Sequence, residues 1–154
     1  MNIFNLKKEL GLNTFSIDMI KGILKKEYSQ PVQKINSMIK KGELIQLKKG
    51  IYTFSEDYRT NSLNLIATAN LLYKPSYVSL EYALSFYGLI PERVYTITSV
   101  TTSRSKDFDT EIGKFSYSKI PLKAYSLGLY WKFDENDGGY MMATAEKALC
   151  DKIY

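Results

Sequence analysis

Residues 29–54 decide the fold, and their sequence is SQPVQKINSMIKKGELIQLKKGIYTF. Ser29 is a candidate helix N-cap, and Pro31 suits the first turn, where a helix leaves its N–H groups without internal partners. The spacing of apolar residues predicts a helix that ends at Lys41, with Gly42 just after its C-terminus. The face that we expect to be buried holds Val32, Ile35, Met38 and Ile39.

The opposite face of this predicted helix contains no acidic residue. A solvated helix face usually mixes charges of both signs, whereas this one offers only amide, hydroxyl and ammonium groups. Such groups can hydrogen-bond to base edges and neutralise phosphates, so the face is predicted to contact DNA. The predicted DNA-contacting residues of this helix are Gln30, Gln33, Lys34, Ser37, Lys40 and Lys41.

The hydrophobic period changes after Gly42. Residues 43–47 alternate in part, Lys48-Lys49-Gly50 predicts a turn, and residues 51–54 predict a returning strand. A hairpin with cations at its tip, placed after a helix of this kind, is typical of the wing of a winged helix. Lys48 and Lys49 are therefore also predicted to contact DNA, as ligands of backbone phosphates.

Two shorter helices are expected upstream, because apolar residues recur there at helical spacing. The first covers residues 2–10 and ends at Gly11, and the second covers residues 17–24 with Ser16 as a candidate N-cap. Three helices followed by a basic hairpin predict a winged helix-turn-helix DNA-binding domain over residues 1–57. A winged helix that serves as a protein-interaction module, and reads no DNA, remains the alternative.

The basic excess of the chain is concentrated in this same segment. The 154 residues carry a net charge of +5, and residues 1–55 alone hold ten lysines against four acids, which gives +6. The remaining residues carry eleven basic and twelve acidic side chains, which gives −1. Such an asymmetry indicates an anionic partner for the first third of the chain.

Several functional classes are excluded by composition, because the chain has no histidine and a single cysteine, Cys150. Metal sites built from His and Cys, and catalysis of the Ser-His-Asp or Cys-His type, are not available. One cysteine makes no internal disulfide, which fits a reducing cytoplasm, and we expect Cys150 to be a small buried residue. No apolar run of transmembrane length and no signal peptide is evident, so a cytoplasmic location and no membrane partner are expected.

Residues 58–154 are predicted to form a second domain, of the α+β class. Helices are expected at residues 61–72, at residues 80–87 with Ser79 as N-cap, and after Thr144 as N-cap. Strands are expected at residues 94–100, 114–120, 127–133 and 140–142, with a polar loop at 101–113 and a turn at Gly138-Gly139. Together these elements predict a small, mostly antiparallel sheet.

No catalytic, metal or cofactor site is expected in this second domain. Asp107, Asp109 and Glu111 alternate, but they lack a glycine-framed metal pattern and a second acidic cluster, which favours a solvated loop. Glu146 and Lys147 are adjacent on a predicted helix and therefore point apart. A phosphate-binding loop of the GxxxxGK type is missing, so we expect that the protein is not an enzyme.

Five stretches of the sequence, in order along the chain, carry a family resemblance. They are IKKGELIQLKKGIY at 39–52, YVSLEYALSFYGLIPE at 77–92, TSVTTSR at 98–104, GKFSY at 113–117 and ATAEKALCD at 143–151. Together they resemble the AbiEi-type antitoxins, which are transcriptional regulators of the type IV toxin–antitoxin, or abortive-infection, class. The first stretch is shared by many winged helices, whereas the later ones are more specific to this family.

The resemblance implies a regulator that binds repeats in its own promoter, represses a toxin–antitoxin operon, and acts as an antitoxin through its second domain. It implies double-stranded DNA as a partner. It also implies a nucleotidyltransferase-type toxin as a functional partner, without a stable complex. A protein-interaction or toxin-neutralising module that does not read DNA is the alternative. Members of the family usually continue past the last motif, so the second domain is expected to be truncated at its C-terminus.

Overall fold

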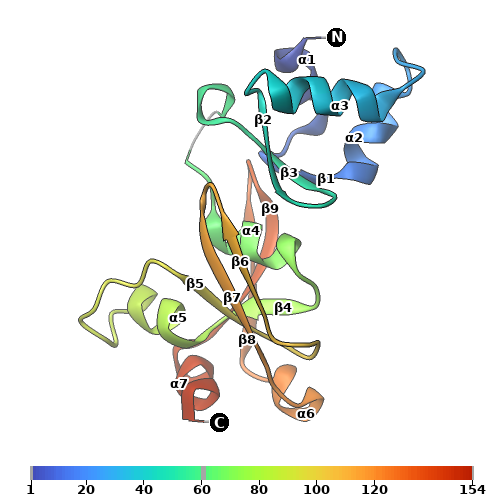
Figure 1. The fold of residues 1–154 in the computed structure, drawn as a ribbon. Helices are drawn as coiled ribbons and strands as arrows, with labels where there is room; N and C mark the ends of the chain where they lie inside the picture. Colours follow the sequence, from blue (N-terminus) through green and yellow to red (C-terminus); the bar gives the residue numbers. More distant parts are fainter. Residues whose placement is uncertain (1, 60–61, 154) are drawn as a thin grey trace. The chain divides into compact units, whose positions relative to one another are not determined.

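A computed structural model describes residues 2–59 and 62–153 as a mixed α+β fold with two β-sheets (Figure 1). The chain divides into two compact units. The first comprises Met1–Leu63 with Glu135–Gly138, and the second comprises Asn64–Asp134 with Gly139–Tyr154. The predicted α+β class is therefore confirmed. Within the described residues, every helix is too short or too polar to cross a bilayer.

The first unit follows the order α1–β1–α2–α3–β2–β3. Its helices are α1 (Ile3–Leu10), α2 (Ile17–Leu24) and α3 (Pro31–Lys40). Its strands are β1 (Thr14–Ser16), β2 (Leu44–Lys48) and β3 (Ile51–Phe54), followed by the 3-10 turn η1 (Glu56–Tyr58). The strands form an antiparallel sheet in the order β1-β3-β2. Strand β1 is not evident in the sequence, because three residues are too few to show an alternating pattern.

The ends of the first unit's helices follow local backbone chemistry. Gly11 ends α1 in the left-handed region at φ 70°, and Gly42 follows α3 at φ 79°, which confirms both predicted closures. The N-cap of α3 is Gln30 rather than Ser29, so that part of the prediction is wrong. Gln30 has a non-helical backbone because the ring of Pro31 disfavours the helical region for the residue before it.

The core of the first unit gathers one side chain or more from each of its helices and strands. Phe15 on β1 and Phe54 on β3 are fully buried, with ring centroids 5.2 Å apart. Around them pack Ile3, Leu6, Ile20, Leu24, Ile35, Met38, Leu44 and Tyr52. Burial of each large apolar side chain stabilises the folded state by roughly 1.5–3 kcal/mol. Because Ile35 and Met38 of α3 belong to this core, their burial fixes the rotation of α3 about its axis.

The second unit combines one sheet with short helices. Its helices are α4 (Leu65–Leu72), α5 (Leu80–Phe86), α6 (Leu122–Tyr125) and α7 (Ala145–Ile153). Its strands are β4 (Ser76–Val78), β5 (Ile97–Thr101), β6 (Lys106–Thr110), β7 (Gly113–Lys119), β8 (Leu129–Asp134) and β9 (Gly138–Ala143). The sheet has six strands in the order β6-β7-β5-β4-β9-β8.

The sheet is mixed, with parallel as well as antiparallel neighbours. Strands β5 and β7 are parallel, as are β4 and β9, whereas β4–β5 and β6–β7 are antiparallel. The predicted loop at 101–113 contains β6, from which the chain returns as β7 between β6 and β5. Phe108 alternates there with the exposed Asp107 and Asp109, a pattern that suits an edge strand.

Other boundaries in the second unit also differ from the sequence expectations. The side chain of Asn64 caps α4 by accepting hydrogen bonds from the N–H groups of Ile66 and Ala67, both at 3.1 Å. The predicted helix start at Asn61 lies outside the described residues. The turn between β8 and β9 occupies residues 135–137, and β9 already begins at Gly138, which corrects the predicted turn at Gly138-Gly139.

Helix α7 begins and faces the sheet in a defined way. Thr144 caps it as predicted, because its Oγ1 accepts a 3.2 Å hydrogen bond from the N–H of Lys147. Ala148 and Asp151 are the buried residues of α7, whereas Cys150 is exposed. The prediction of a buried cysteine is therefore wrong, because Cys150 lies on the outer side of the helix.

Candidate functional site

Helix α3 carries an outer face that is accessible to a partner. Ile35 and Met38 are only 1% and 2% exposed, and they fix which side of α3 points inward. The side chains that point outward are Val32, Gln33, Asn36 and Lys40, all of them exposed. We call these four residues the outer face of α3. The outer face combines two amides, one ammonium group and one apolar side chain, and it contains no acid.

The structure splits the six residues of α3 that the sequence placed on one face. Gln33 and Lys40 lie on the outer face, and Gln30 is exposed at the N-cap position. Ser37 is half-buried. The prediction that these residues share one face therefore holds only for part of the set.

Lys34 and Lys41 lie on a different side of α3, toward α1. Both line a cavity of about 430 Å³ whose wall also includes Phe4 of α1. The Nζ of Lys34 is 5.2 Å from the ring centroid of Tyr28, which holds this side chain against an aromatic surface. These two lysines therefore lie on a different side of α3 from Gln33 and Lys40.

Asn36 is the residue of the outer face that the sequence analysis missed. The predicted buried face of the helix included Val32, but this side chain is 44% exposed in the structure. Ile35 and Met38 alone, without Val32, give the correct rotation and place Asn36 outward. Asparagine is well suited to base recognition because its amide can donate to and accept from the major-groove edge of adenine.

The hairpin that follows α3 is confirmed, with a bulge between Gln46 and Lys48. Lys48 is the last residue of β2, and the exposed Lys49 lies in the turn with Gly50, which adopts φ 90°. The carbonyl of Gly50 accepts a 2.8 Å hydrogen bond from the N–H of Ile17. The hairpin end, with Lys49, is thereby held beside the start of α2.

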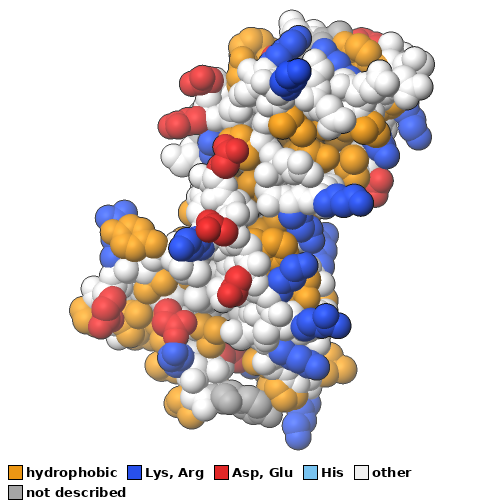
Figure 2. Space-filling view, viewed as in Figure 1, with side chains coloured by type: hydrophobic (Ala, Val, Ile, Leu, Met, Phe, Trp, Pro, Cys, Tyr) orange, Lys and Arg blue, Asp and Glu red, His pale blue; other side chains and the backbone are white. Residues whose placement is uncertain are grey.

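Basic side chains are spread over both units, although the net positive charge belongs to the N-terminal third. Figure 2 shows lysine and arginine side chains on the first unit, and a further row of them along the right-hand edge of the second unit in this view. The exposed lysines of the second unit are Lys74, Lys106, Lys114, Lys119, Lys123, Lys132 and Lys152. Their charge is balanced overall by the acids of the same segment.

A buried polar network is the second notable arrangement, and it lies within the second unit. Asp151 on α7 accepts hydrogen bonds at its Oδ2 from the hydroxyls of Tyr77, at 3.0 Å, and Ser79, at 2.6 Å. Its Oδ1 lies 2.8 Å from the Nζ of Lys147, which also donates to the carbonyl of Ala124. The side chains of Lys147 and Asp151 are only 10% and 2% exposed. We call Tyr77, Ser79, Lys147 and Asp151 the Asp151 network.

The Asp151 network joins two of the stretches that carry the family resemblance, residues 77–92 and 143–151. Burial, followed by the nearby Asp151 carboxylate, raises the pKa of the Tyr77 phenol above its ordinary value, so this group remains a donor. Ser79 occupies the predicted N-cap position of α5, but its hydroxyl donates to Asp151 and makes no capping hydrogen bond to the helix. Each of the four side chains has a hydrogen-bond or ion-pair partner within the network, so the network suits a structural role, the anchoring of α7.

The alternating acids of the second unit do not assemble into a site. Asp107 and Asp109 lie on edge strand β6, where Asp109 is paired in register with Lys114. Among residues 2–59 and 62–153, the structure brings together no group of three or more Asp, Glu or Cys side chains placed to hold a metal ion.

Comparison of the chain with protein-family models gave no match, and comparison with curated proteins gave none either.

Proposed function

We propose that the first unit is a winged helix-turn-helix domain that binds double-stranded DNA, and that the protein is a transcriptional regulator of its own operon. The observation that carries this proposal is the exposed, acid-free outer face of α3 within the order α1–β1–α2–α3–β2–β3. We take this order as that of a winged helix, with the third helix in the major groove and the β2–β3 hairpin as the wing.

In this proposal some side chains contact base edges and others contact backbone phosphates. Gln33 and Asn36 carry amides that suit adenine edges, and Val32 offers an apolar contact to a thymine methyl group. Lys40 and the hairpin residues Lys48 and Lys49 would neutralise phosphates on either side of the groove. Lys34 and Lys41, on the α1 side, would contribute to the general positive field and make no contact in the groove.

A single winged helix presents only a few base-reading side chains, and specific binding therefore needs more than one copy on the DNA. We propose that copies of the protein occupy repeats in the operon's promoter, in the cytoplasm, and that the protein has no enzymatic activity. The resemblance of residues 39–52 and 77–151 to AbiEi-type antitoxins supports an operon of the toxin–antitoxin type.

Binding to duplex DNA is the first test of this proposal. The full chain should bind a duplex from the region upstream of its own gene more tightly than a shuffled duplex of equal length. If each bound domain contacts about four phosphates, raising the salt from about 50 to about 200 mM should weaken binding by roughly a hundredfold. Fluorescence anisotropy at several salt concentrations measures both effects. Equal affinity for the two duplexes, or no dependence on salt, would contradict the proposal.

An antitoxin activity is the second part of the proposal, and it rests on the resemblance of the second unit. The Asp151 network gives two of the resembling stretches a common structural role, because residues 77 and 79 contact residue 151 directly. The toxin would be of the nucleotidyltransferase type, and no stable complex with it is proposed.

Co-expression tests the antitoxin activity separately from DNA binding. A nucleotidyltransferase encoded next to this gene should arrest growth when expressed from an independent promoter, and the full chain should restore growth. The triple variant Gln33→Ala, Asn36→Ala, Lys40→Ala should also restore growth, because these residues belong to the proposed DNA-contacting surface. Failure of the wild-type chain to restore growth would refute the antitoxin activity. Co-purification of the two proteins as a stable complex would instead favour the alternative, a toxin-neutralising interaction module.

A further inference from the structure

Four basic residues of the second unit lie at one end of its sheet. The parallel strands β5 and β7 both end there, at Thr101 and Lys119, which are paired in register. The antiparallel neighbours β4 and β6 begin at the same end, where a loop joins β5 to β6 (Figure 1). Lys74 lies just before β4, Arg104 lies in the loop, and Lys106 is the first residue of β6. We call the exposed Lys74, Arg104, Lys106 and Lys119 the sheet-end patch.

Hydrogen bonds and a ring contact hold the parts of the sheet-end patch next to one another. The hydroxyl of Tyr73 donates a 2.8 Å hydrogen bond to the carbonyl of Arg104, and the Nζ of Lys106 lies 5.9 Å from the centroid of the Tyr73 ring. The hydroxyl oxygen of Ser105 accepts a 2.9 Å hydrogen bond from the N–H of Lys119. Because these contacts already order the loop and the Lys106 side chain, binding of a partner requires less ordering of this surface.

The positive charges of the sheet-end patch are not neutralised by neighbouring acids. In the described part of the chain, none of the four cations forms an ion pair. Side chains alternate along β6, so Asp107 points to the face of the sheet opposite to that of Lys106. Lys152, elsewhere in the same unit, differs because it is paired with Glu81. The sheet-end patch is therefore suited to an anionic partner.

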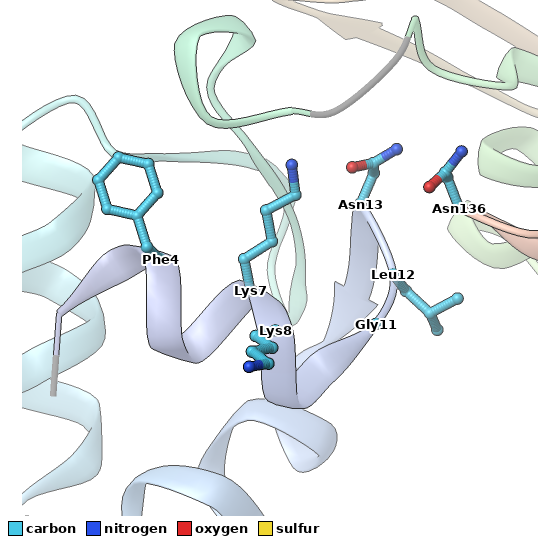
Figure 3. A pocket seen from close by; sticks show the side chains of 7 residues that line it. All are labelled: Phe4, Lys7, Lys8, Gly11, Leu12, Asn13 and Asn136. Carbon is cyan, nitrogen blue, oxygen red and sulfur yellow. The ribbon is translucent and has the colours of Figure 1, made fainter.

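The spacing of the cations indicates an extended anion rather than a small one. Two lysines of the first unit, Lys7 and Lys8, both line a cavity of about 290 Å³, but Figure 3 shows their side chains pointing in opposite directions from α1. They therefore present no common site to a ligand. The cations of the sheet-end patch are instead spread over the end of one sheet. A nucleic-acid backbone suits such a surface, because each strand of a duplex carries one phosphate per roughly 3.4 Å of its axis.

We propose that the sheet-end patch binds the phosphate backbone of duplex DNA, as a contact in addition to that of the first unit. This role rests on the proposed binding of DNA by the first unit. Arg104 and Lys119 would neutralise phosphates, and the exposed hydroxyl of Ser105 would donate to a phosphate oxygen. Such contacts carry no sequence information. Because both units belong to one chain, the second contact forms intramolecularly and raises the affinity for any duplex sequence.

Fluorescence anisotropy with the full chain, at several salt concentrations, tests the second contact. The probes are the upstream duplex, the shuffled duplex and a single-stranded RNA of equal length. The patch variant is Arg104→Gln, Lys119→Gln. The control variant is Lys114→Gln, Lys132→Gln, which removes two exposed lysine charges from the opposite end of β7 and from the far edge strand β8.

The patch variant should bind both duplexes about tenfold more weakly than the wild type at about 100 mM salt. The slope of log affinity against log salt should fall by about two, because two fewer phosphates are neutralised. The preference for the upstream duplex should remain, since the first unit is unchanged. The control variant should lose less than about threefold in affinity, through the reduced general field alone.

The two duplexes distinguish a failure of the second contact from a failure of the first unit. Unchanged affinity in a patch variant that is folded by circular dichroism, or equal losses in the patch and control variants, overturns the second contact alone. A wild-type chain without preference between the duplexes, whose patch variant still loses affinity, refutes sequence recognition by the first unit and supports the patch. A loss confined to the RNA probe, or a wild-type chain that binds neither duplex, overturns the assignment of the patch to DNA.

Discussion

Alanine at both Lys40 and Lys49 is expected to weaken binding to the upstream duplex by about a hundredfold or more, at about 100 mM salt. Lys40 lies on the outer face of α3, and Lys49 lies in the exposed turn of the hairpin. A hydrogen bond between an ammonium group and a phosphate contributes roughly 1.5–3 kcal/mol, so the loss of two such contacts costs about 3 kcal/mol or more. The salt dependence of binding should fall as well, because fewer counterions are released. Anisotropy titrations measure both changes.

A matched control is available on the same helix. Alanine at both Lys34 and Lys41 removes the same two charges, but these lysines line the cavity on the α1 side. We expect this control variant to bind the duplex less than about fivefold more weakly than the wild type, through the reduced general field alone. Equal losses in the two double variants would show that net charge, and not the outer face, determines binding. A loss confined to the control variant would place the DNA on the α1 side of the helix.

The difference between the two pairs of lysines shows how far the sequence alone defines the candidate surface. The three helices, the hairpin and the glycines that end α1 and α3 were predictable, since each depends on neighbouring residues. The rotation of α3 about its axis was not predictable from neighbouring residues. It depends on which apolar side chains of α3 pack against Phe15 and Phe54, which are distant in the sequence. Val32 is apolar and yet exposed, so a rule that buries apolar residues turned the expected face away from Asn36.

In the second unit, too, neighbouring residues predict single elements but not how distant elements pack together. Strands β5 and β7 were expected from their β-branched and aromatic residues, but no local pattern tells which strands become neighbours. The parallel pairing of β5 with β7 arises because β6 takes the edge position, and β6 has the polar composition of a loop. The Asp151 network was equally hidden from the sequence, since Ser79 and Asp151 are 72 residues apart.

Asp151→Ala is the substitution in the second unit for which we expect the largest loss of stability, a fall of about 3–5 kcal/mol in the free energy of unfolding. The change leaves the Lys147 ammonium buried without its counter-charge, and it removes the acceptor of the Tyr77 and Ser79 hydroxyls. Breaking a buried ion pair from one side has a cost of this size, because the remaining charge stays desolvated. Urea unfolding followed by the fluorescence of Trp131, on β8 of the same unit, measures the loss.

Two further variants separate the network from a general effect of charge. Asp107→Ala removes an exposed carboxylate from β6 and should change the free energy of unfolding by less than about 0.5 kcal/mol. The double variant Lys147→Met, Asp151→Leu removes both buried charges and should be more stable than Asp151→Ala alone, since no unpaired ammonium group is left. If Asp151→Ala unfolds at the same urea concentration as the wild type, the network does not hold α7 in place. If instead the double variant loses as much stability as Asp151→Ala or more, packing around Asp151, and not its charge, anchors the helix that carries the last of the resembling stretches.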